Sequence, residues 1–174
     1  AAAAAVPAPM SVLIADFDNR AKEPLFDGTL EQALALGIEG ASFIGAYPRS
    51  DALRAVQQIA PGGRLDLERA RLLARREGIK VVIAGAVEAN GAGYTLNVRA
   101  VDPAPGVLLA SVSGTAASKS DVLKTIADLS SELRSRLGDT TPESARAAEK
   151  ETFTSSSLEA ARAYSQGQEL QWAA

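Results

Sequence analysis

The chain has 174 residues, of which 47% are hydrophobic, and its formal net charge at pH 7 is −3. A chain of this length can bury one core of about 100 to 150 residues, with appendages outside it. Histidine and cysteine are both absent, which excludes imidazole bases, Ser-His and Cys-His nucleophiles, disulfides, and zinc sites built on nitrogen or sulfur. Acidic and basic residues are interspersed, so we expect no nucleic-acid partner.

Residues 1–10 form a linker rich in alanine and proline. Together with residues 11–15 they make an apolar stretch of about 15 residues, which is shorter than the roughly 20 that a membrane span needs. We therefore expect contact with a membrane only through a span of the parent chain that lies outside this segment.

The next part of the chain predicts two strands and three helices. Residues 11–17 are apolar on both faces, as in a strand that is covered on both sides, and a helix follows from Leu30. Residues 41–47 predict a second, weaker strand, and a helix over residues 50–59 follows it. Asp66 can cap a further helix that ends at Gly78, with Leu72 and Leu73 as its buried anchors.

Residues 81–115 predict a three-stranded antiparallel meander. Its strands cover residues 81–87, 94–100 and 107–115, and glycine- and proline-rich turns separate them. A last helix then runs to Leu137, with apolar residues at helical spacing from Val122 onward, and Gly138 ends it. We expect this helix to lie across the sheet.

These elements predict an α/β (α+β) fold with the order β-α-β-α-α-β-β-β-α, in which helices pack on a mixed sheet. The folded domain covers residues 11–138, and residues 139–154 form a spacer. Residues 155–174 predict a C-terminal helical extension. Its apolar stripe, which contains Leu158, Ala161 and Leu170, has no visible partner in the sequence.

Candidate chemistry is confined to the end of the first strand. Asp16 and Asp18 are two residues apart, so both carboxylates would project from one face, as in a hard-cation site or an acid/base pair. However, Asp18 followed by Asn19 is also a common start of a turn, and two carboxylates alone bind cations weakly. We favour the structural role, and keep Asn19 or Arg20 as a polar anchor for a small ligand.

Residues 12–34, 78–85 and 155–167 resemble a domain of bacterial eukaryotic-like serine/threonine kinases. In that family the domain follows the kinase domain and a membrane span, and precedes tetratricopeptide repeats. The resemblance implies that residues 155–174 begin a truncated tetratricopeptide-like array and that the domain lies on the extracytoplasmic, periplasmic side of the inner membrane. The element order is also similar to that of the TolB amino-terminal domain.

The leading hypothesis is a non-catalytic interaction or sensory domain of such a membrane-anchored kinase. Its expected partners are other proteins or its own tetratricopeptide repeats. The expected contact surfaces are an exposed sheet edge, the stripe of Leu158, Ala161 and Leu170, and the loop of residues 18–28. The alternatives are a small-ligand receptor with a pocket near residues 16–20 and, less favoured, a metal-assisted hydrolase at Asp16 and Asp18. We expect this chain to be no enzyme and to hold no cofactor.

Overall fold

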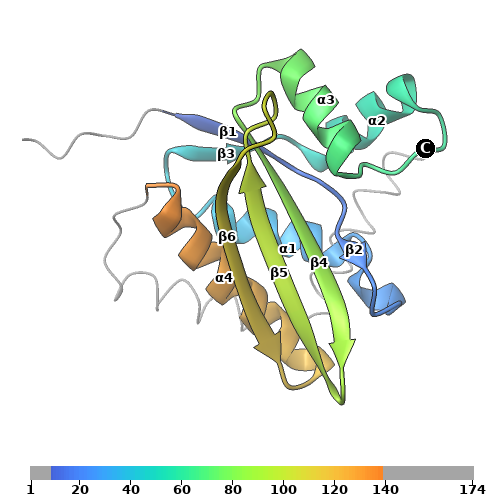
Figure 1. The fold of residues 1–174 in the computed structure, drawn as a ribbon, viewed down its shortest axis with the longest axis vertical. Helices are drawn as coiled ribbons and strands as arrows, with labels where there is room; N and C mark the ends of the chain where they lie inside the picture. The colour runs from blue at the N-terminus through green and yellow to red at the C-terminus, as the bar shows by residue number, and fades with distance from the viewer. Residues whose placement is uncertain (1–8, 139–174) are drawn as a thin grey trace, which may run out of the picture.

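The computed structural model describes residues 9–138. Within them, the chain forms a six-stranded mixed sheet with the order β3-β1-β4-β5-β6, and a short strand, β2, pairs with β4 (Figure 1). The strands are β1 (Met10–Ile14), β2 (Asp18–Asn19), β3 (Ile44–Ala46), β4 (Val81–Asn90), β5 (Gly93–Val101) and β6 (Leu108–Ala116). Strand β1 runs parallel to both β3 and β4, whereas β4, β5 and β6 form an antiparallel meander.

Four α-helices and two 3-10 turns connect and cover the described strands. The helices are α1 (Thr29–Ile38), α2 (Arg49–Ile59), α3 (Leu67–Glu77) and α4 (Val122–Arg136), and the 3-10 turns are η1 (Pro24–Phe26) and η2 (Lys119–Asp121). The predicted fold class and element order are confirmed, with β2 as an additional short strand. Caps predicted for α3 are also present, because the Asp66 carboxylate accepts from the Arg69 N–H and Gly78 ends the helix in a left-handed conformation.

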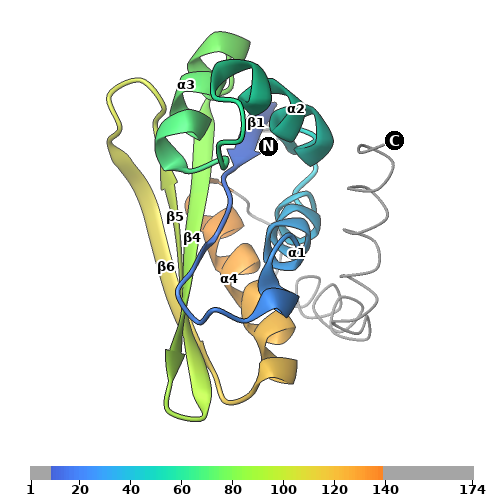
Figure 2. The same ribbon diagram turned by 90° about the vertical axis from the view of Figure 1, so that its right-hand side faces the viewer.

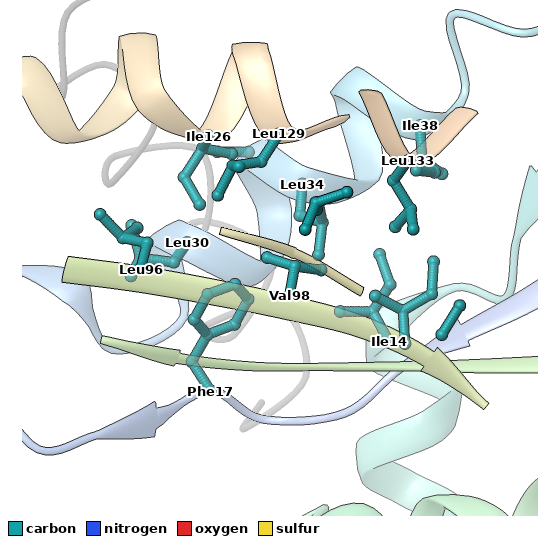
Figure 3. Close-up of a cluster of buried hydrophobic side chains, with 14 of the residues drawn as sticks. Ile14, Phe17, Leu30, Leu34, Ile38, Leu96, Val98, Ile126, Leu129 and Leu133 are labelled. Atoms are coloured by element: carbon teal, nitrogen blue, oxygen red, sulfur yellow. The ribbon is translucent and has the colours of Figure 1, made fainter. Parts of the chain in front are cut away.

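The larger core lies between the sheet and the pair α1 and α4, which run side by side on one of its faces (Figure 2). Figure 3 shows how side chains from both helices meet those of the strands. Leu34 and Leu133 are fully buried there, as are Leu96 and Val98 of β5. Every second residue of β5 from Leu96 to Ala100 therefore faces this core.

A second core lies on the opposite face of the sheet, beneath α2 and α3. Strand β1 supplies both cores, because Val12 and Ile14 belong to the first while Leu13 and Ala15 belong to the second. This explains the apolar run on both faces of the first strand. Leu73 is buried here, but Leu72 is 44% exposed, so the prediction of Leu72 as a buried anchor is wrong. Ala70 and Ala74 line the buried face of α3 instead.

Strand β1 is shorter than predicted, and the position of its end determines where Asp16, Asp18 and Asn19 lie. It ends at Ile14, and the Asp16 N–H donates to the carbonyl of Leu65 instead of continuing the sheet. The chain leaves the sheet at that point, and Asp18 and Asn19 return to it as β2 beside Ala86 and Val87.

Most of the predicted linker lies outside the described residues. The predicted spacer and helical extension lie entirely outside them. Leu158, Ala161 and Leu170 therefore remain predictions. Within residues 9–138, no helix combines the length and the hydrophobicity that crossing a membrane requires.

Candidate functional site

A cavity of about 480 Å³ lies beyond the carboxyl ends of β1 and β3. The helix that follows β1 packs on one face of the sheet, and the helix that follows β3 packs on the other. Connections that diverge in this way leave a crevice between two neighbouring parallel strands, which is where open α/β sheets commonly bind ligands. The lining residues are Asp16, Asn19, Lys22, Pro24, Asp27, Gly28, Glu31, Arg49 and Arg64.

Asp16 connects the segment after β1 to the start of α2 and to the segment before α3. Its Oδ1 lies 2.8 Å from Nη2 of Arg49, and its Oδ2 accepts from the Leu65 N–H at 3.0 Å and lies 3.9 Å from Nε of Arg64. Arg64 also donates to the carbonyl of Phe17 at 2.9 Å. The Asp16 carboxylate is thus neutralised by two guanidinium groups and is already bonded to the backbone.

Glu31, on the first turn of α1, is the deepest charged group in the cavity wall, with 4% of its surface exposed. Its Oε1 accepts from the Phe17 N–H at 2.7 Å, whereas its Oε2 is buried and has no hydrogen-bond partner among the described residues. Burial raises the pKa of Glu31 to about 7, and Arg49 opposes part of this rise. A carboxyl group with this pKa is present in both protonation states near neutral pH.

Sequence reasoning missed Glu31. Its position between Leu30 and Ala33 is compatible with the polar side of an amphipathic helix. Only the crossing of the loop after β1 over the start of α1 buries it, so periodicity could not have found it.

Asn19 shapes the loop that forms the opposite wall. Its Nδ2 donates to the carbonyl of Glu23 at 2.8 Å and to Oδ1 of Asp27 at 3.0 Å. Lys22 lies within this loop with a φ of 56°, a left-handed conformation that is uncommon for a residue other than glycine. The predicted contact loop of residues 18–28 therefore supplies one side of the cavity.

The structure does not bring Asp16 and Asp18 together. Asp18 lies on the surface, where its Oδ2 is 2.7 Å from Nε of Arg20, and the same guanidinium reaches Oε1 of Glu88 at 2.8 Å. The hydrogen bond that the Arg20 guanidinium donates to Asp18 is the main cause that raises the pKa of Arg20. Of the residues predicted from the sequence, Asp16 and Asn19 line the cavity, while Asp18 and Arg20 do not. In residues 9–138, acidic side chains nowhere gather in a group of three that could hold a metal ion.

A smaller hollow of about 230 Å³ lies on the other side of Glu31 and Arg49. These two residues line both spaces and form the wall between them. The remaining lining includes Leu36 of α1 and Tyr47, just after β3. Burial raises the pKa of the Tyr47 hydroxyl, so it stays protonated at neutral pH.

The second surface of interest is the free edge of β6. This strand ends the sheet, and no described strand pairs with its outer side. Its first residues, Leu108 and Leu109, and the preceding Val107 are about half exposed. Arg71 of α3 donates to the carbonyls of Pro103 and Ala104, which holds the β5–β6 turn in place. The exposed sheet edge predicted from the sequence thus carries a patch of apolar side chains.

No protein-family model matches the sequence, and no curated protein matches it. The structure is similar to that of the LpoB C-terminal domain from Salmonella enterica, with 20% identity and a TM-score of 0.56 over 66% of this chain and 87% of that one. It is also similar to the lipoprotein GNA1162 from Neisseria meningitidis, with 18% identity and a TM-score of 0.56 over 76% and 100% of the two chains.

The PelC dodecamer from Paraburkholderia phytofirmans is a further match, with 16% identity and a TM-score of 0.51 over 77% of this chain and 90% of that one. TolB from Acinetobacter baumannii, whose amino-terminal domain has an element order similar to the predicted one, matches over 75% of this chain and 27% of its own length, with 13% identity and a TM-score of 0.45. At these identities the matches show a shared fold. Of these proteins, GNA1162 is a lipoprotein and PelC forms a dodecamer.

Proposed function

We propose that this chain is a non-catalytic, extracytoplasmic interaction domain that docks a partner protein along the free edge of β6. The observation that carries the proposal is the combination of an open strand edge and apolar side chains at Val107, Leu108 and Leu109. An edge strand presents unpaired N–H and C=O groups, to which an extended segment of a partner can add as a further strand.

The local structure supports this docking mode. Arg71 fixes the β5–β6 turn against α3, so the start of β6 is held in place before a partner arrives. The pairing of β5 with β6 shifts register here and leaves Leu109 without a partner residue on β5. Apolar side chains of the partner strand would cover Leu108 and Leu109, and the backbone ladder would set the register. Burial of these side chains would supply affinity.

The non-catalytic part of the proposal is supported by the composition of the cavity. Histidine and cysteine are absent from the sequence, and no hydroxyl or thiol side chain lines the cavity among the described residues. Asp16 is occupied by Arg49, Arg64 and the Leu65 N–H. Neither a hydroxyl or thiol nucleophile nor a group of metal ligands is therefore available there among the described residues.

The extracytoplasmic location is supported by the shared fold of the lipoprotein GNA1162, and the parent protein is proposed from the sequence resemblance alone. In that proposal the domain connects the membrane span of a bacterial serine/threonine kinase to its tetratricopeptide repeats. The sequence of the complete gene tests this directly. A kinase domain and a span before residue 1, with repeats after residue 174, are expected, and a gene that lacks the kinase would overturn the assignment.

Site-specific photo-crosslinking tests the docking surface. A photoreactive residue at position 108 of the full-length protein, irradiated in the producing bacterium, is expected to give one adduct of defined mass. The matched control places the same residue at Arg75, which is exposed on α3. The adduct should appear only at position 108 and disappear when Leu109→Lys is added. Equal adducts at both positions, or none at position 108, would overturn docking on β6.

A second candidate function, a small-ligand receptor, is favoured by one specific observation. The cavity contains a buried carboxyl oxygen, Oε2 of Glu31, without a hydrogen-bond partner among the described residues. Buried polar atoms in folded proteins are nearly always bonded, so this oxygen is suited to a ligand donor. The two functions use separate surfaces and do not exclude each other.

A further inference from the structure

The charged groups of the 480 Å³ cavity are arranged by depth. Glu31 lies in the inner wall with 4% exposure, whereas Arg64 and Lys22 are exposed at the rim. Asp27 also lies at the rim, where its Oδ1 is bonded by Asn19. The inner wall thus carries the Glu31 carboxyl group beside the Asp16–Arg49 ion pair, and the opening carries two cations, Lys22 and Arg64, and one carboxylate, Asp27.

Glu31 has a buried oxygen in the interior that can accept a new donor. The Phe17 N–H holds Oε1 at 2.7 Å, which fixes the orientation of the carboxyl group and leaves Oε2 without a described partner. Oδ1 of Asp16 is also buried without a hydrogen-bond partner among the described residues, but it lies 2.8 Å from Nη2 of Arg49, so the charge of Asp16 is already compensated. An ammonium group that enters the cavity therefore meets its strongest attraction at Glu31.

The rim contains two cations, Lys22 and Arg64, together with the Asp27 carboxylate, which accepts from Asn19. Among the described residues none forms an ion pair with the Lys22 ammonium, and its backbone is held by a hydrogen bond from the Lys22 N–H to the carbonyl of Asn19. Helix α1 starts beside it at Gly28, an N-cap without a side chain to bond the first N–H groups of the helix. A helix start of this kind and a nearby ammonium together favour a carboxylate.

We propose that the cavity binds a small zwitterion, of the class of free amino acids and dipeptides, with its ammonium group at Glu31 and its carboxylate between Lys22 and the start of α1. The volume of about 480 Å³ falls within the range of small-molecule sites and accommodates either class. This inference rests on the second candidate function, the ligand receptor, and is independent of docking on β6.

Three matched probes test the proposal by isothermal titration calorimetry on the chain of residues 1–174. Glycylglycine carries both charges, N-acetylglycylglycine carries only the carboxylate, and glycylglycinamide carries only the ammonium group. Glycylglycine is expected to bind at least tenfold more tightly than either single-charge probe. Equal affinity for glycylglycine and N-acetylglycylglycine would overturn the role of Glu31 as an ammonium site.

Two variants and a control assign the contacts. Glu31→Gln keeps an oxygen for the Phe17 N–H but removes the negative charge, so it should weaken glycylglycine at least tenfold and leave N-acetylglycylglycine unchanged. Lys22→Asn removes the rim charge while tolerating the left-handed backbone, and should weaken both carboxylate probes. Lys80→Ala, at an exposed position outside the cavity, is the control and should bind like the unchanged chain.

Proton release gives an independent readout. Burial raises the pKa of Glu31 to about 7, and a bound ammonium group should lower it again. Asp16 and Arg49 face Glu31 most closely, and Lys22, Asp27 and Arg64 line the same cavity. Titrations at pH 7 in buffers of different ionisation enthalpy should show protons released on glycylglycine binding, and none in Glu31→Gln. No proton release in the unchanged chain would contradict the proposed contact.

One further experiment separates failure of the zwitterion proposal from failure of the receptor proposal. A thermal-shift panel of sugars, nucleotides and divalent cations covers other ligand classes. A shift from that panel that Glu31→Gln abolishes, without dipeptide binding, would overturn the zwitterion but retain the receptor. No response to any probe would overturn both and leave docking on β6 as the remaining proposal.

Discussion

Two neighbouring regions of this molecule, the apolar core beneath α1 and α4 and the charged cavity beyond β1 and β3, use the same chain segments in opposite ways. Phe17 is buried in the core, while Asp16 beside it holds the cavity wall. On α1, Leu34 lies in the core and Glu31 lies in the cavity. The core is closed by its own side chains, whereas the cavity leaves a buried carboxyl oxygen unbonded by any described residue. The first region is therefore closed by apolar packing, whereas the second retains a polar group that a small ligand could bind.

The largest expected effect on the free energy of unfolding comes from truncating a side chain of the apolar core. Leu34→Ala removes a fully buried side chain from α1 and should lower the free energy of unfolding by about 2 to 5 kcal/mol. Leu36→Ala, on the same helix but 55% exposed, should change it by less than about 0.5 kcal/mol. Urea unfolding of both variants measures the difference. Similar losses in the two would show that the core boundary on α1 is misplaced.

The next effect is specific to the cavity and depends on pH. Because the pKa of Glu31 is about 7 in the folded chain and the model-compound value is 4.5, the folded state binds the proton more tightly than the unfolded state. Glu31 therefore costs no stability below pH 4.5, and the cost grows to about 3 kcal/mol as the pH rises through 7. Glu31→Gln should lack this contribution.

Chemical unfolding of the unchanged chain and of Glu31→Gln between pH 4.5 and 8 measures this pH-dependent contribution of Glu31. The difference between their unfolding free energies should grow in favour of Glu31→Gln as the pH rises, and it should level off above pH 7 to 8. Taking the difference removes the contributions of all other titrating groups that the substitution leaves unchanged. Parallel curves would mean that Glu31 is not buried as a carboxyl group.

A third test probes how Phe17, whose N–H donates to Glu31 of the cavity, packs against β4. A Cβ added at Gly85 would lie 2.5 Å from the ring of Phe17, so Gly85→Ala must displace the ring. We expect a loss of about 1 to 3 kcal/mol from this overpacking. Gly45→Ala is the matched control, because nothing lies within 4 Å of a Cβ at that strand position. Equal thermal midpoints for the two variants would contradict the placement of Phe17 on β4.

The smallest effect distinguishes the two predicted aspartates. Asp16→Asn retains an acceptor for the Leu65 N–H but loses the charge that faces Arg49 and Arg64, and should destabilise by about 1 kcal/mol. Asp18→Asn acts only on a surface pair with Arg20 and should leave the thermal midpoint unchanged. A larger loss in Asp18→Asn than in Asp16→Asn would reverse the assignment of structural roles.

Local sequence signals were sufficient for the elements and their order. The turn over residues 90–93, the Asp66 cap and Gly78 each satisfy a backbone requirement within a few residues, so the meander and α3 could be predicted directly. Strand β1 was also predictable, because an apolar run on both faces indicates two cores. Its end at Ile14 was not, since the hydrogen bond from Asp16 to Leu65 joins residues 49 apart in the sequence.

The sequence by itself determined an α/β chain without imidazole or thiol chemistry and with candidate polar residues after the first strand. The tertiary structure decided which of those residues share a site. It separated Asp16 from Asp18, and it added Glu31, Arg49 and Arg64 from three other segments. Burial and charge pairing depend on segments that are distant in sequence, and periodicity within one element carries no information about them. For this reason the cavity, unlike the strands and helices around it, became visible only in the folded chain.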